Sequence, residues 1–481
     1  MSKADAQYPE PRQFIAGQWR KAEGSCAVVH NPATGDILAD VPRASQRDLD
    51  DALASSSAAF NVWRRRSAIE RGAILSRAAE LIRERAGELA RRMTLEQGKT
   101  LAESSLEFSI TAETLDWYAA EGRRAYGRVI PARQPGARQL VLPEPIGPVA
   151  AFTPWNFPAV LPARKVAAAL AAGCTVVLKP SEETPASSIG LAQALADAGL
   201  PDGALNVVFG VPSEVSTHLI RSPIIRKVHF TGSTSVGRQL ALLAAEGLKP
   251  CTLELGGHAP VLVFDDADLD MTVAACIQGK TRNAGQVCTS PTRFLVQRGI
   301  YDDFVRRFGK AMDGLVVGPG LDPSSQMGAL ANRRRLDAME ELTADAIGGG
   351  GRLVAGGHRA HGTGFFWRPS LVADVPASAK AMEIEPFGPL AFVRPFSTLE
   401  EALVEANRLP YGLAAYAFTS SAATAVAVSD ELQAGGVGIN SFSVSNTEAP
   451  FGGVKDSGYG AEGGPEGLQA FMHLKYVNHV T

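Results

Sequence analysis

The chain has 481 residues, of which 45% are hydrophobic, 20% charged and 7% aromatic. These proportions are typical of a folded globular protein and exclude a mostly disordered chain. The 47 Lys and Arg residues against 50 Asp and Glu give a net charge of −3, so the whole chain lacks the basic footprint of a nucleic-acid-binding protein. At roughly 150 residues per domain, this length predicts two or three structural units.

The N-terminus and the apolar runs predict a protein without a secretory signal or a membrane span. Residues 1–13 are polar and contain no basic segment followed by an apolar one. The longest apolar run, Val166 to Leu178, is shorter than the ~20 residues needed to cross a bilayer. Five cysteines without a C-x-x-C pair fit neither a disulfide framework nor a zinc cluster. We therefore expect no metal site and a reducing, cytoplasmic location.

The first third of the chain predicts short strands followed by long helices. Two strand pairs are expected, over residues 14–19 and 28–41. Apolar residues from Ile69 to Leu89 recur at steps of three and four, which indicates one helix with a single buried face. A further helix is expected to run to about Tyr118. The prolines and the turn within residues 127–145 predict an extended β arm.

From residue 148 the chain alternates short apolar runs with helical patterns, which predicts parallel α/β sheets. The first set ends near the strand Lys227–Thr231, and a second set runs from Val261 to about Asn440. The tail, Leu474 to Val480, predicts another strand. With the arm it would form an oligomerisation sheet, because exposed edges of this kind are normally covered.

Cys288 and Glu254 lie in sequence contexts that favour chemistry. Cys288 follows the small, polar residues 282–287, which would leave its thiol reachable. Glu254 sits between two leucines, where loss of hydration would raise its pKa toward the range of a general base. From this segment alone, a salt-bridged or solvated glutamate stays open. The remaining cysteines lie among apolar residues and predict buried side chains; they are Cys26, Cys174, Cys251 and Cys276.

Two further segments follow strands of the first set. Asn156 lies in Pro-Trp-Asn-Phe-Pro, at the sheet edge where open α/β folds bind ligands. Its amide is suited to a developing oxyanion, although it could simply cap the loop. Residues 230–237, Phe-Thr-Gly-Ser-Thr-Ser-Val-Gly, lead from a strand through a glycine turn into a helix, which suits a phosphate group. Because the segment is neither G-x-G-x-x-G nor a Walker sequence, it is a weak signal alone.

Together these motifs resemble the aldehyde dehydrogenase superfamily over essentially the whole chain. The segments occur in the order of that family and are P-W-N-F-P (154–158), K-P-S-E (179–182), F-T-G-S (230–233), E-L-G-G (254–257), G-Q-V-C (285–288), E-P-F-G-P (385–389) and P-F-G-G (450–453). Each is modest alone, and their order makes the resemblance specific. It implies an α/β fold with a Rossmann-type cofactor domain, a second α/β catalytic domain and a small β oligomerisation arm.

The resemblance also implies a division of the chain. Residues 1–121 and 146–253 are expected to form the NAD-binding domain, and residues 254–440 the catalytic domain. Residues 122–145 and 441–481 would form the oligomerisation arm and the C-terminal tail.

The resemblance implies a catalytic role for five residues. Cys288 matches the nucleophile that attacks the aldehyde carbon, giving a thiohemiacetal and then a thioester. Asn156 and the backbone N–H of Cys288 would hold the oxyanion. Glu254 matches the general base that activates the water for thioester hydrolysis. Lys165 and Glu462 match positions of a proton relay.

NAD is the implied cofactor, and NADP is the open alternative. Lys179 and Glu182 match a pair at the adenosine ribose, where a carboxylate would repel a 2′-phosphate and so favour NAD. Ser233 and Trp155 fit the pyrophosphate region. The other expected cofactor contacts, the last two at the nicotinamide ribose and ring, are Thr153, Ser181, Gly232, Gly237, Leu255, Glu385 and Phe387.

Arg164 and Arg282 point to the class of substrate. Members that oxidise simple aliphatic aldehydes are similar but carry aromatic residues at these positions. Succinate-semialdehyde and 2-oxoglutarate-semialdehyde dehydrogenases resemble this chain at both arginines. Two guanidinium groups beside an apolar tunnel would bind a substrate carboxylate, and Ser445 and Asn446 would close that site. The two semialdehydes stay nearly equal as candidates.

Three alternatives stay open. They are the oxidation of another aldehyde class, a CoA-acylating aldehyde dehydrogenase, and a catalytically silent binding protein with the same fold. Glu254 argues against the second, because an enzyme that uses CoA needs no base for water. The combination of Cys288, Asn156 and Glu254 argues against the third. The expected partner is a small aldehyde, with neither nucleic acid nor membrane, in a homodimer or homotetramer.

Overall fold

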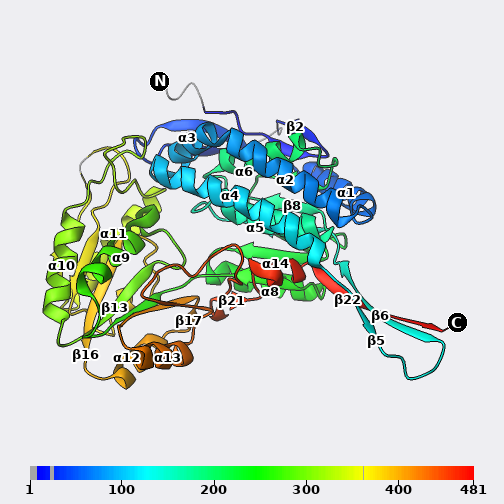
Figure 1. The fold of residues 1–481 in the computed structure, drawn as a ribbon. Coiled ribbons are helices and arrows are strands. Elements are labelled where there is room, and N and C mark those ends of the chain that lie inside the picture. The colour runs from blue at the N-terminus through cyan, green and yellow to red at the C-terminus, as the bar shows by residue number, and fades with distance from the viewer. Residues whose placement is uncertain (1–7, 22–25, 361, 481) are drawn as a thin grey trace.

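The computed structural model describes residues 8–21, 26–360 and 362–480, so residues 1–7 and 22–25 of the expected cofactor domain lie outside the description. The chain forms two α/β lobes, and a narrow arm projects from one of them (Figure 1). This arrangement confirms the predicted α/β class. Within the described ranges, no helix is long and apolar enough to cross a membrane.

The first lobe is built on an eight-stranded sheet with the order β2-β1-β9-β8-β7-β10-β11-β21. Its five central strands, from β9 to β11, are parallel, as the alternation of apolar runs and helices predicts. The strands are β1 (Gln13–Ile15), β2 (Gln18–Arg20), β7 (Val149–Phe152), β8 (Val176–Lys179), β9 (Leu205–Val207), β10 (Lys227–Thr231), β11 (Cys251–Glu254) and β21 (Gly458–Tyr459).

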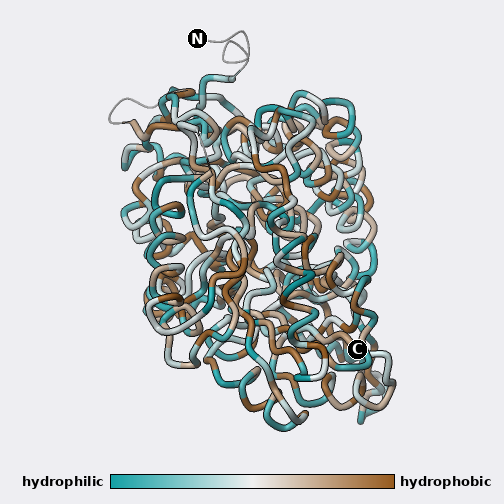
Figure 2. The backbone as a smooth tube through the Cα atoms, turned by 90° about the vertical axis from the view of Figure 1, so that its left-hand side faces the viewer, coloured by the Kyte–Doolittle hydropathy of each residue, from teal (hydrophilic) through white to brown (hydrophobic). Residues whose placement is uncertain are grey.

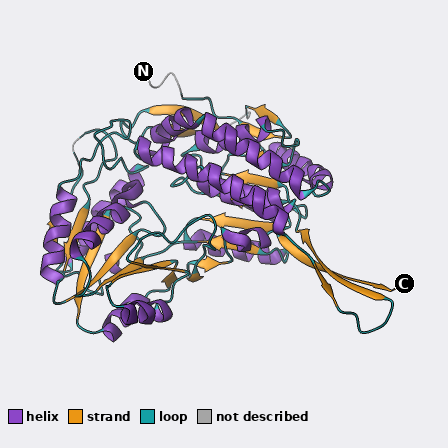
Figure 3. Ribbon diagram, in the orientation of Figure 1, coloured by secondary structure: helices purple, strands orange, loops and turns teal. Residues whose placement is uncertain are grey.

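Helices flank this sheet (Figure 3). Three of them begin at a capping box, in which Ser45, Ser67 or Thr100 exchanges hydrogen bonds with an acidic residue three positions on. The helices are α1 (Gln46–Trp63), α2 (Ala68–Glu84), α3 (Ala86–Gln97), α4 (Leu101–Glu121), α5 (Val160–Ala172), α6 (Pro185–Asp197), α7 (Pro212–Arg221), α8 (Thr234–Glu246) and α14 (Gly464–Gln469).

The apolar pattern from Ile69 to Leu89 forms two helices, so the prediction of one continuous helix is wrong. α2 ends at Glu84 and α3 begins at Ala86, with Arg85 outside helical geometry between them. Ile69 is 64% exposed, so the buried face begins only at Ile74. The apolar period stays in step across the break, which is why periodicity alone does not reveal it.

The second lobe holds a seven-stranded sheet with the order β14-β15-β16-β13-β12-β18-β19. Only β14 is antiparallel to its neighbour. The strands are β12 (Ala259–Val263), β13 (Pro291–Gln297), β14 (Arg352–Ala355), β15 (Ser370–Ala373), β16 (Leu390–Phe396), β18 (Ala414–Phe418) and β19 (Gly436–Ile439). The helices are α9 (Leu269–Thr281), α10 (Tyr301–Asp313), α11 (Arg333–Gly348), α12 (Leu399–Asn407) and α13 (Ala422–Glu431).

The arm is a three-stranded antiparallel sheet of β5 (Arg128–Ile130), β6 (Ala137–Pro145) and β22 (Met472–Val480). The predicted pairing of the residue 127–145 segment with the tail is therefore confirmed. Two small ribbons complete the strands: β3 (Cys26–His30) with β4 (Ile37–Pro42), and β17 (Tyr411–Gly412) with β20 (Val454–Lys455).

Separate apolar cores fill the two lobes. The helices around them alternate between hydrophobic and hydrophilic residues along their length, as expected when one face is buried (Figure 2). The chain passes from the first sheet to the second between β11, which ends at Glu254, and β12. Glu254, the proposed general base, therefore lies where the chain passes from the first lobe to the second.

Candidate active site

A cavity of about 270 Å³ gathers several of the predicted site residues. Its wall is built from α4, α5, α9 and the loops that carry Cys288 and Ser445. The predicted residues on this wall are Cys288, Glu254, Arg164, Arg282 and Ser445. Asn446 is not on the wall; it is exposed and accepts a hydrogen bond from Ser443. Lys165, Glu462 and Asn156 are buried beside the wall rather than on it.

Cys288 is half-buried and reaches the cavity, as its sequence context predicts. It follows a short 3₁₀ segment, Arg282–Gly285, in which Asn283 and Ala284 have φ values of 50° and 51°. Gly285 also has positive φ, and a Cβ there would lie 2.2 Å from the carbonyl oxygen of Gly388. This left-handed backbone turns the thiol toward Glu254. Any residue other than glycine at position 285 would clash with Gly388, so the turn requires glycine.

The thiol and the carboxylate of Glu254 are in direct contact. Cys288 Sγ donates to Glu254 Oε1 at 3.4 Å. Burial, together with the negative charges of Glu254 and Glu385, raises the pKa of the Cys288 thiol well above its ordinary value. The thiol is therefore protonated at neutral pH, and the nearest group able to take its proton is the carboxylate it already contacts.

The other cysteines follow the sequence prediction only in part. Cys174 and Cys276 are buried, and Cys251 is half-buried. Cys26 is exposed, so its predicted burial is wrong. It begins β3, which pairs only with β4 in a two-stranded ribbon, and apolar neighbours in sequence do not bury a residue in such a ribbon.

Glu254 is buried at the end of β11. Burial, and next the charge of Glu462, raise its pKa, which is the direction expected for a carboxylate between two leucines. Its second oxygen, Oε2, accepts from Thr231 Oγ1 at 2.9 Å. One carboxylate oxygen thus faces the thiol, and the other is fixed by a hydroxyl group.

Lys165 and Glu462 form a buried ion pair behind Glu254. Lys165 Nζ lies 2.5 Å from Glu462 Oε1 and donates to Thr231 Oγ1 at 2.7 Å. Burial works to raise the pKa of Glu462, but Lys165 and His229 hold it below its ordinary value. Hydrogen bonds therefore connect Glu254 through Thr231 and Lys165 to Glu462. Sequence reasoning placed Thr231 in the phosphate turn and missed its contact with Glu254, and it missed His229 altogether, although polar residues at alternate positions of a buried strand are a usable signal.

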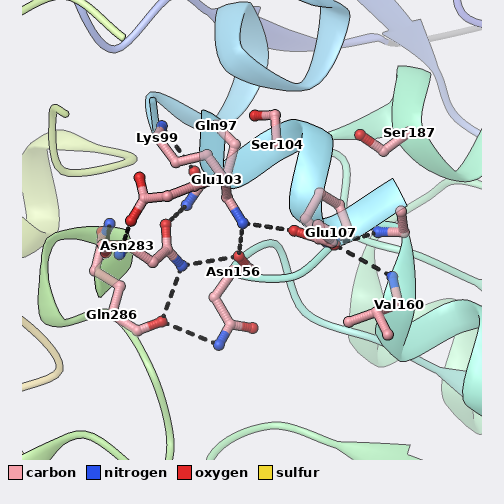
Figure 4. A network of polar contacts seen from close by, with 12 residues as sticks. Gln97, Lys99, Glu103, Ser104, Glu107, Asn156, Val160, Ser187, Asn283 and Gln286 are labelled. Carbon is pink, nitrogen blue, oxygen red and sulfur yellow. Dashed lines mark hydrogen bonds and ion pairs between the residues drawn. The ribbon is translucent and has the colours of Figure 1, made fainter. Parts of the chain in front are cut away.

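Asn156 is held by a network of buried polar groups (Figure 4). Its backbone oxygen accepts from Lys99 Nζ at 2.8 Å and from Asn283 Nδ2 at 2.9 Å. Its side-chain Nδ2 donates to the carbonyl of Gln286 at 3.1 Å. The loop of the expected oxyanion donor is thereby tied to the loop that ends in the nucleophile.

The Lys99–Glu107 ion pair organises this network and was not found from the sequence. Lys99 Nζ lies 2.6 Å from Glu107 Oε2, and both side chains are almost completely buried. Glu107 Oε1 accepts the backbone N–H groups of Ala159 and Val160, at 2.8 and 3.2 Å, where α5 begins. A carboxylate at this position complements the positive end of the helix that carries Arg164 and Lys165. The charged pair therefore holds both the Asn156 loop and the start of α5 in place.

The two arginines differ in how they meet the cavity. Arg164 is only 6% exposed, and its Nη2 donates to Ser445 Oγ at 2.9 Å. Its guanidinium lies 5.6 Å from the centre of the Phe451 ring. Arg282 is exposed, with its guanidinium 5.1 Å from the centre of the Phe157 ring. Apolar residues form much of the remaining wall, namely Leu106, Ile110, Val160, Leu161 and Val287.

The residues expected at the adenosine end of a dinucleotide lie at the end of β8 and in the loop that follows it. Lys179 Nζ and Glu182 Oε1 are 2.5 Å apart, and Glu182 also accepts the backbone N–H of Gly210 at 3.1 Å. Ser181 accepts the backbone N–H of Glu183. Burial lowers the pKa of Lys179, while Glu182 opposes that shift.

The glycine turn after β10 leads into α8. Gly232 lies in the turn, and the exposed Ser233 is the residue before the first turn of the helix. A Cβ on Gly237 would lie 2.3 Å from Leu255 Cδ2, so glycine lets α8 pack directly against the segment after β11. The free amides at this helix start suit an anionic phosphate.

Two of the residues expected at the cofactor carry buried polar atoms without partners, as do several residues elsewhere in the described chain. Within the described part of the chain, Thr153 Oγ1 and Glu385 Oε1 are buried and have no hydrogen-bond partner. Burial raises the pKa of Glu385 to about 8. Trp155 and Phe387 meet edge to face with their ring centres 5.5 Å apart. Because unpaired buried polar atoms are costly, these residues fit a ligand that brings hydroxyl and amide groups.

A metal site would need several His, Cys, Asp or Glu side chains close together. Among the residues that the structure describes, no cluster of three or more His, Cys, Asp or Glu side chains is arranged to bind a metal.

Comparison with known proteins gives one consistent result. The sequence model of the aldehyde dehydrogenase family matches residues 19–477. The chain is 50% identical over 475 residues to 4-(hydroxymethyl)benzenesulfonate dehydrogenase TsaD1 of Comamonas testosteroni, which covers 98% of this chain and 99% of that relative. It is 42% identical over 478 residues to the NADP(+) succinate-semialdehyde dehydrogenase GabD of Escherichia coli, with 99% of each chain covered.

Solved structures agree. The crystal structure of succinate-semialdehyde dehydrogenase from Burkholderia pseudomallei superposes with a TM-score of 0.97 at 40% identity, and 99% of each chain is covered. The matches in sequence and in fold span nearly the full chain, including the loops that bring Cys288 beside Glu254. The chain therefore belongs to the aldehyde dehydrogenase family.

Proposed function

We propose that this aldehyde dehydrogenase oxidises a semialdehyde that carries a carboxylate, either succinate semialdehyde or 2-oxoglutarate semialdehyde, to the dicarboxylic acid. The observation that carries the proposal is that Arg164 and Arg282 line the same cavity as Cys288. A carboxylate between two guanidinium groups gains charge-assisted hydrogen bonds, and the aldehyde end is then left beside the thiol.

Cys288 and Glu254 would carry the covalent steps. The Cys288 thiol gives its proton to Glu254 as sulfur attacks the aldehyde carbon, and the Asn156 amide stabilises the resulting oxyanion. A bound NAD, held by the residues expected at the cofactor such as Glu385 and Phe387, would supply the hydride acceptor for this oxidation, and Cys288 would then carry the acyl group as a thioester. Glu254, which lines the cavity, would release the thiol proton to solvent and, ionised again, would take a proton from water so that the hydroxide attacks the thioester. We favour water over CoA as the acceptor because a base already lies 3.4 Å from the sulfur.

NAD is the proposed cofactor, with NADP as the alternative. The proposal is supported by Glu182, whose carboxylate beside Lys179 would bind ribose hydroxyls and repel a 2′-phosphate. Since the name of the relative GabD includes NADP(+), the preference needs a direct test. Ser233 and Trp155 would lie at the pyrophosphate of the bound dinucleotide. Glu385 would lie at its nicotinamide ribose and Phe387 at its nicotinamide ring, and Thr153 would take a further polar group.

An aromatic aldehyde with a sulfonate group is the second candidate substrate. The relative TsaD1, at 50% identity, is named for a benzenesulfonate. The apolar wall of the cavity suits an arene ring, and guanidinium groups bind sulfonate oxygens by the same charge-assisted hydrogen bonds as carboxylate oxygens. The two candidates share an anionic group at the far end from the aldehyde.

One kinetic comparison tests both candidates. We would measure kcat/KM for succinate semialdehyde, 2-oxoglutarate semialdehyde, 4-sulfobenzaldehyde and uncharged butyraldehyde, each with NAD and with NADP. A preference for either semialdehyde supports the first candidate, and a preference for 4-sulfobenzaldehyde supports the second. A preference for butyraldehyde would contradict the role of the arginines, and absence of NADH with every aldehyde would contradict the function.

We also propose that the arm serves assembly into a homodimer or homotetramer. Leu474, Tyr476 and Val480 along β22 are 68%, 56% and 60% exposed. The arm to which β22 belongs projects away from both lobes (Figure 1). Light scattering of the wild type and of a chain ending at residue 471 would test this role.

A further inference from the structure

One face of the buried strand β10 carries three polar side chains. Lys227, His229 and Thr231 alternate along the strand and are 2%, 1% and 6% exposed. Burying polar groups costs free energy unless each has a partner, so such a row in a core strand calls for a reason. Thr231 contacts the proposed general base, but His229 has no role in the proposed function so far.

His229 is fixed as a donor to Glu462. Its Nε2 lies 2.8 Å from Glu462 Oε1, and its ring stacks on Phe471 with the ring centres 5.3 Å apart. Burial and the charge of Lys165 lower the pKa of His229 to about 4, so the ring is neutral at neutral pH. Because a carboxylate oxygen can only accept, the hydrogen of the neutral ring is on Nε2.

The hydrogen bonds at Glu462 Oε1 decide where the Thr231 hydroxyl points. A carboxylate oxygen offers about two lone-pair sites. Lys165 Nζ, at 2.5 Å, and His229 Nε2, at 2.8 Å, fill them. Thr231 Oγ1 also lies within 3.5 Å of this oxygen but has the shorter alternative of Glu254 Oε2 at 2.9 Å.

We propose that His229 is a positioning residue, which by occupying Glu462 Oε1 directs the Thr231 hydroxyl to the general base Glu254. Lys165 donates to Thr231 Oγ1 at 2.7 Å, so Thr231 can donate its own hydroxyl proton only to Glu254 or to Glu462. Without the donor at position 229, Glu462 Oε1 is open and Thr231 turns to it. Glu254 Oε2 then loses its hydrogen bond. The inference rests on the proposed role of Glu254 in thioester hydrolysis.

The charged groups around these hydrogen-bonded side chains determine the direction in which the pKa of Glu254 should change. Lys165 and Arg164 from α5, Lys227 from β10, and the carboxylates of Glu462 and Glu254 face the three side chains. The hydrogen bond from Thr231 lowers the pKa of Glu254 against the effect of burial. Losing it raises that pKa, so a smaller fraction of Glu254 is ionised at neutral pH and the acid limb of deacylation moves to higher pH.

The test compares His229→Leu with His229→Gln. Gln can place its amide nitrogen where Nε2 stands, whereas Leu keeps the volume without a donor. In pre-steady-state experiments with excess succinate semialdehyde and NAD, we expect His229→Leu to slow thioester hydrolysis, measured as the steady rate after the NADH burst, about ten-fold at neutral pH, the loss expected for one hydrogen bond to a charged group. The burst of NADH should keep its amplitude. His229→Gln should stay within about two-fold of the wild type, because the donor is restored.

Three outcomes would overturn the proposal. They are equal hydrolysis rates in the wild type and His229→Leu, equal losses in the Leu and Gln variants, or an additional loss when His229→Leu is combined with Thr231→Val, which already lacks the hydroxyl. If His229→Leu does not fold, as judged by its thermal unfolding midpoint, His229→Asn replaces it, because its amide is too short to reach Glu462. A wild type without any NADH burst would instead overturn the proposed function.

Discussion

The substrate side and the cofactor side of the site are built on different principles. On the substrate side, buried side chains from β10, β11, α5 and the C-terminal segment already bond to one another around Glu254. On the cofactor side, Ser233 is exposed, and Thr153 and Glu385 hold buried atoms without partners among the described residues. In the described chain the substrate side also holds unpartnered buried atoms, at Asn156 Oδ1, Arg164 Nε and Glu462 Oε2, so the two sides differ mainly in the hydrogen bonds that already hold the group around Glu254 in place. Changes to the hydrogen-bonded groups around Glu254 should therefore reduce rates, whereas changes at the cofactor residues should alter the affinity for the cofactor.

The largest expected effect is at the nucleophile. Cys288→Ala removes the atom that forms the thioester, so aldehyde oxidation should fall by about 10⁴-fold or more. NAD affinity, measured by calorimetry, should stay unchanged, because the predicted cofactor contacts lie on other segments. Sustained NADH formation by this variant would contradict covalent catalysis by Cys288. The proposed division between a substrate side and a cofactor side would then no longer hold.

The next effect is at the general base. Glu254→Gln keeps the hydrogen bond from Thr231 possible but cannot accept a proton, so thioester hydrolysis should slow by about 10²- to 10⁴-fold. An acyl-enzyme should then be visible by intact mass spectrometry, heavier than the free enzyme by the mass of the product acid less one water. Normal turnover without this species would show that another group activates the water.

Glu254 also predicts the pH profile. Its pKa is raised by burial and by Glu462, and the base must be ionised to act. The deacylation rate should therefore rise with pH through a value above that of an ordinary glutamate, and fall as pH drops through it. Glu254→Gln should lose this limb, and persistence of the limb in that variant would assign it to a different group.

A smaller effect separates the two arginines. Arg164→Met removes a buried guanidinium and should raise KM for the preferred anionic aldehyde by about 10- to 100-fold. Arg282→Met removes an exposed one and should raise it by less than about five-fold. Butyraldehyde is the control substrate, and its KM should respond equally little to both changes. Equal losses for charged and uncharged aldehydes would show that the arginines act on the fold of the cavity.

How much of this site can be predicted from the sequence depends on whether a residue acts within its own motif. Cys288 and Glu254 are recognisable because their immediate neighbours define a reachable thiol and a desolvated carboxylate. Arg164 reaches the cavity because helix α5 follows the Asn156 loop directly. Lys99 and Glu107 escape notice because their partners lie 57 and 52 residues away, at Asn156 and Ala159. No local pattern encodes such a contact, which exists only after α4 packs on α5.

The fold shows the same limit. The parallel direction of most strands in each lobe follows from the alternation of apolar runs and helices, and the arm follows from its prolines and the matching tail, whereas the order of the strands does not follow from the alternation. The predicted burial of Cys26 is wrong because burial depends on what packs over a strand, and the strand's own sequence does not reveal that. Asn446 was placed near the substrate by its position before Pro450, but it is the neighbouring Ser445 that bonds to Arg164.

The smallest expected effect tests the cofactor side. Glu182→Gln keeps an oxygen for the N–H of Gly210 and removes the charge that would repel a 2′-phosphate. Because Glu182 is partly exposed, the ratio of kcat/KM for NADP to that for NAD should rise by only about three- to ten-fold. Glu183→Gln is the matched control, since Glu183 is the next acidic residue along the chain and bonds to Asn332 and Arg334 instead. If both variants shift the ratio equally, the preference comes from the summed negative charge of this loop. If neither does, the cofactor side selects its ligand through backbone and glycine contacts alone.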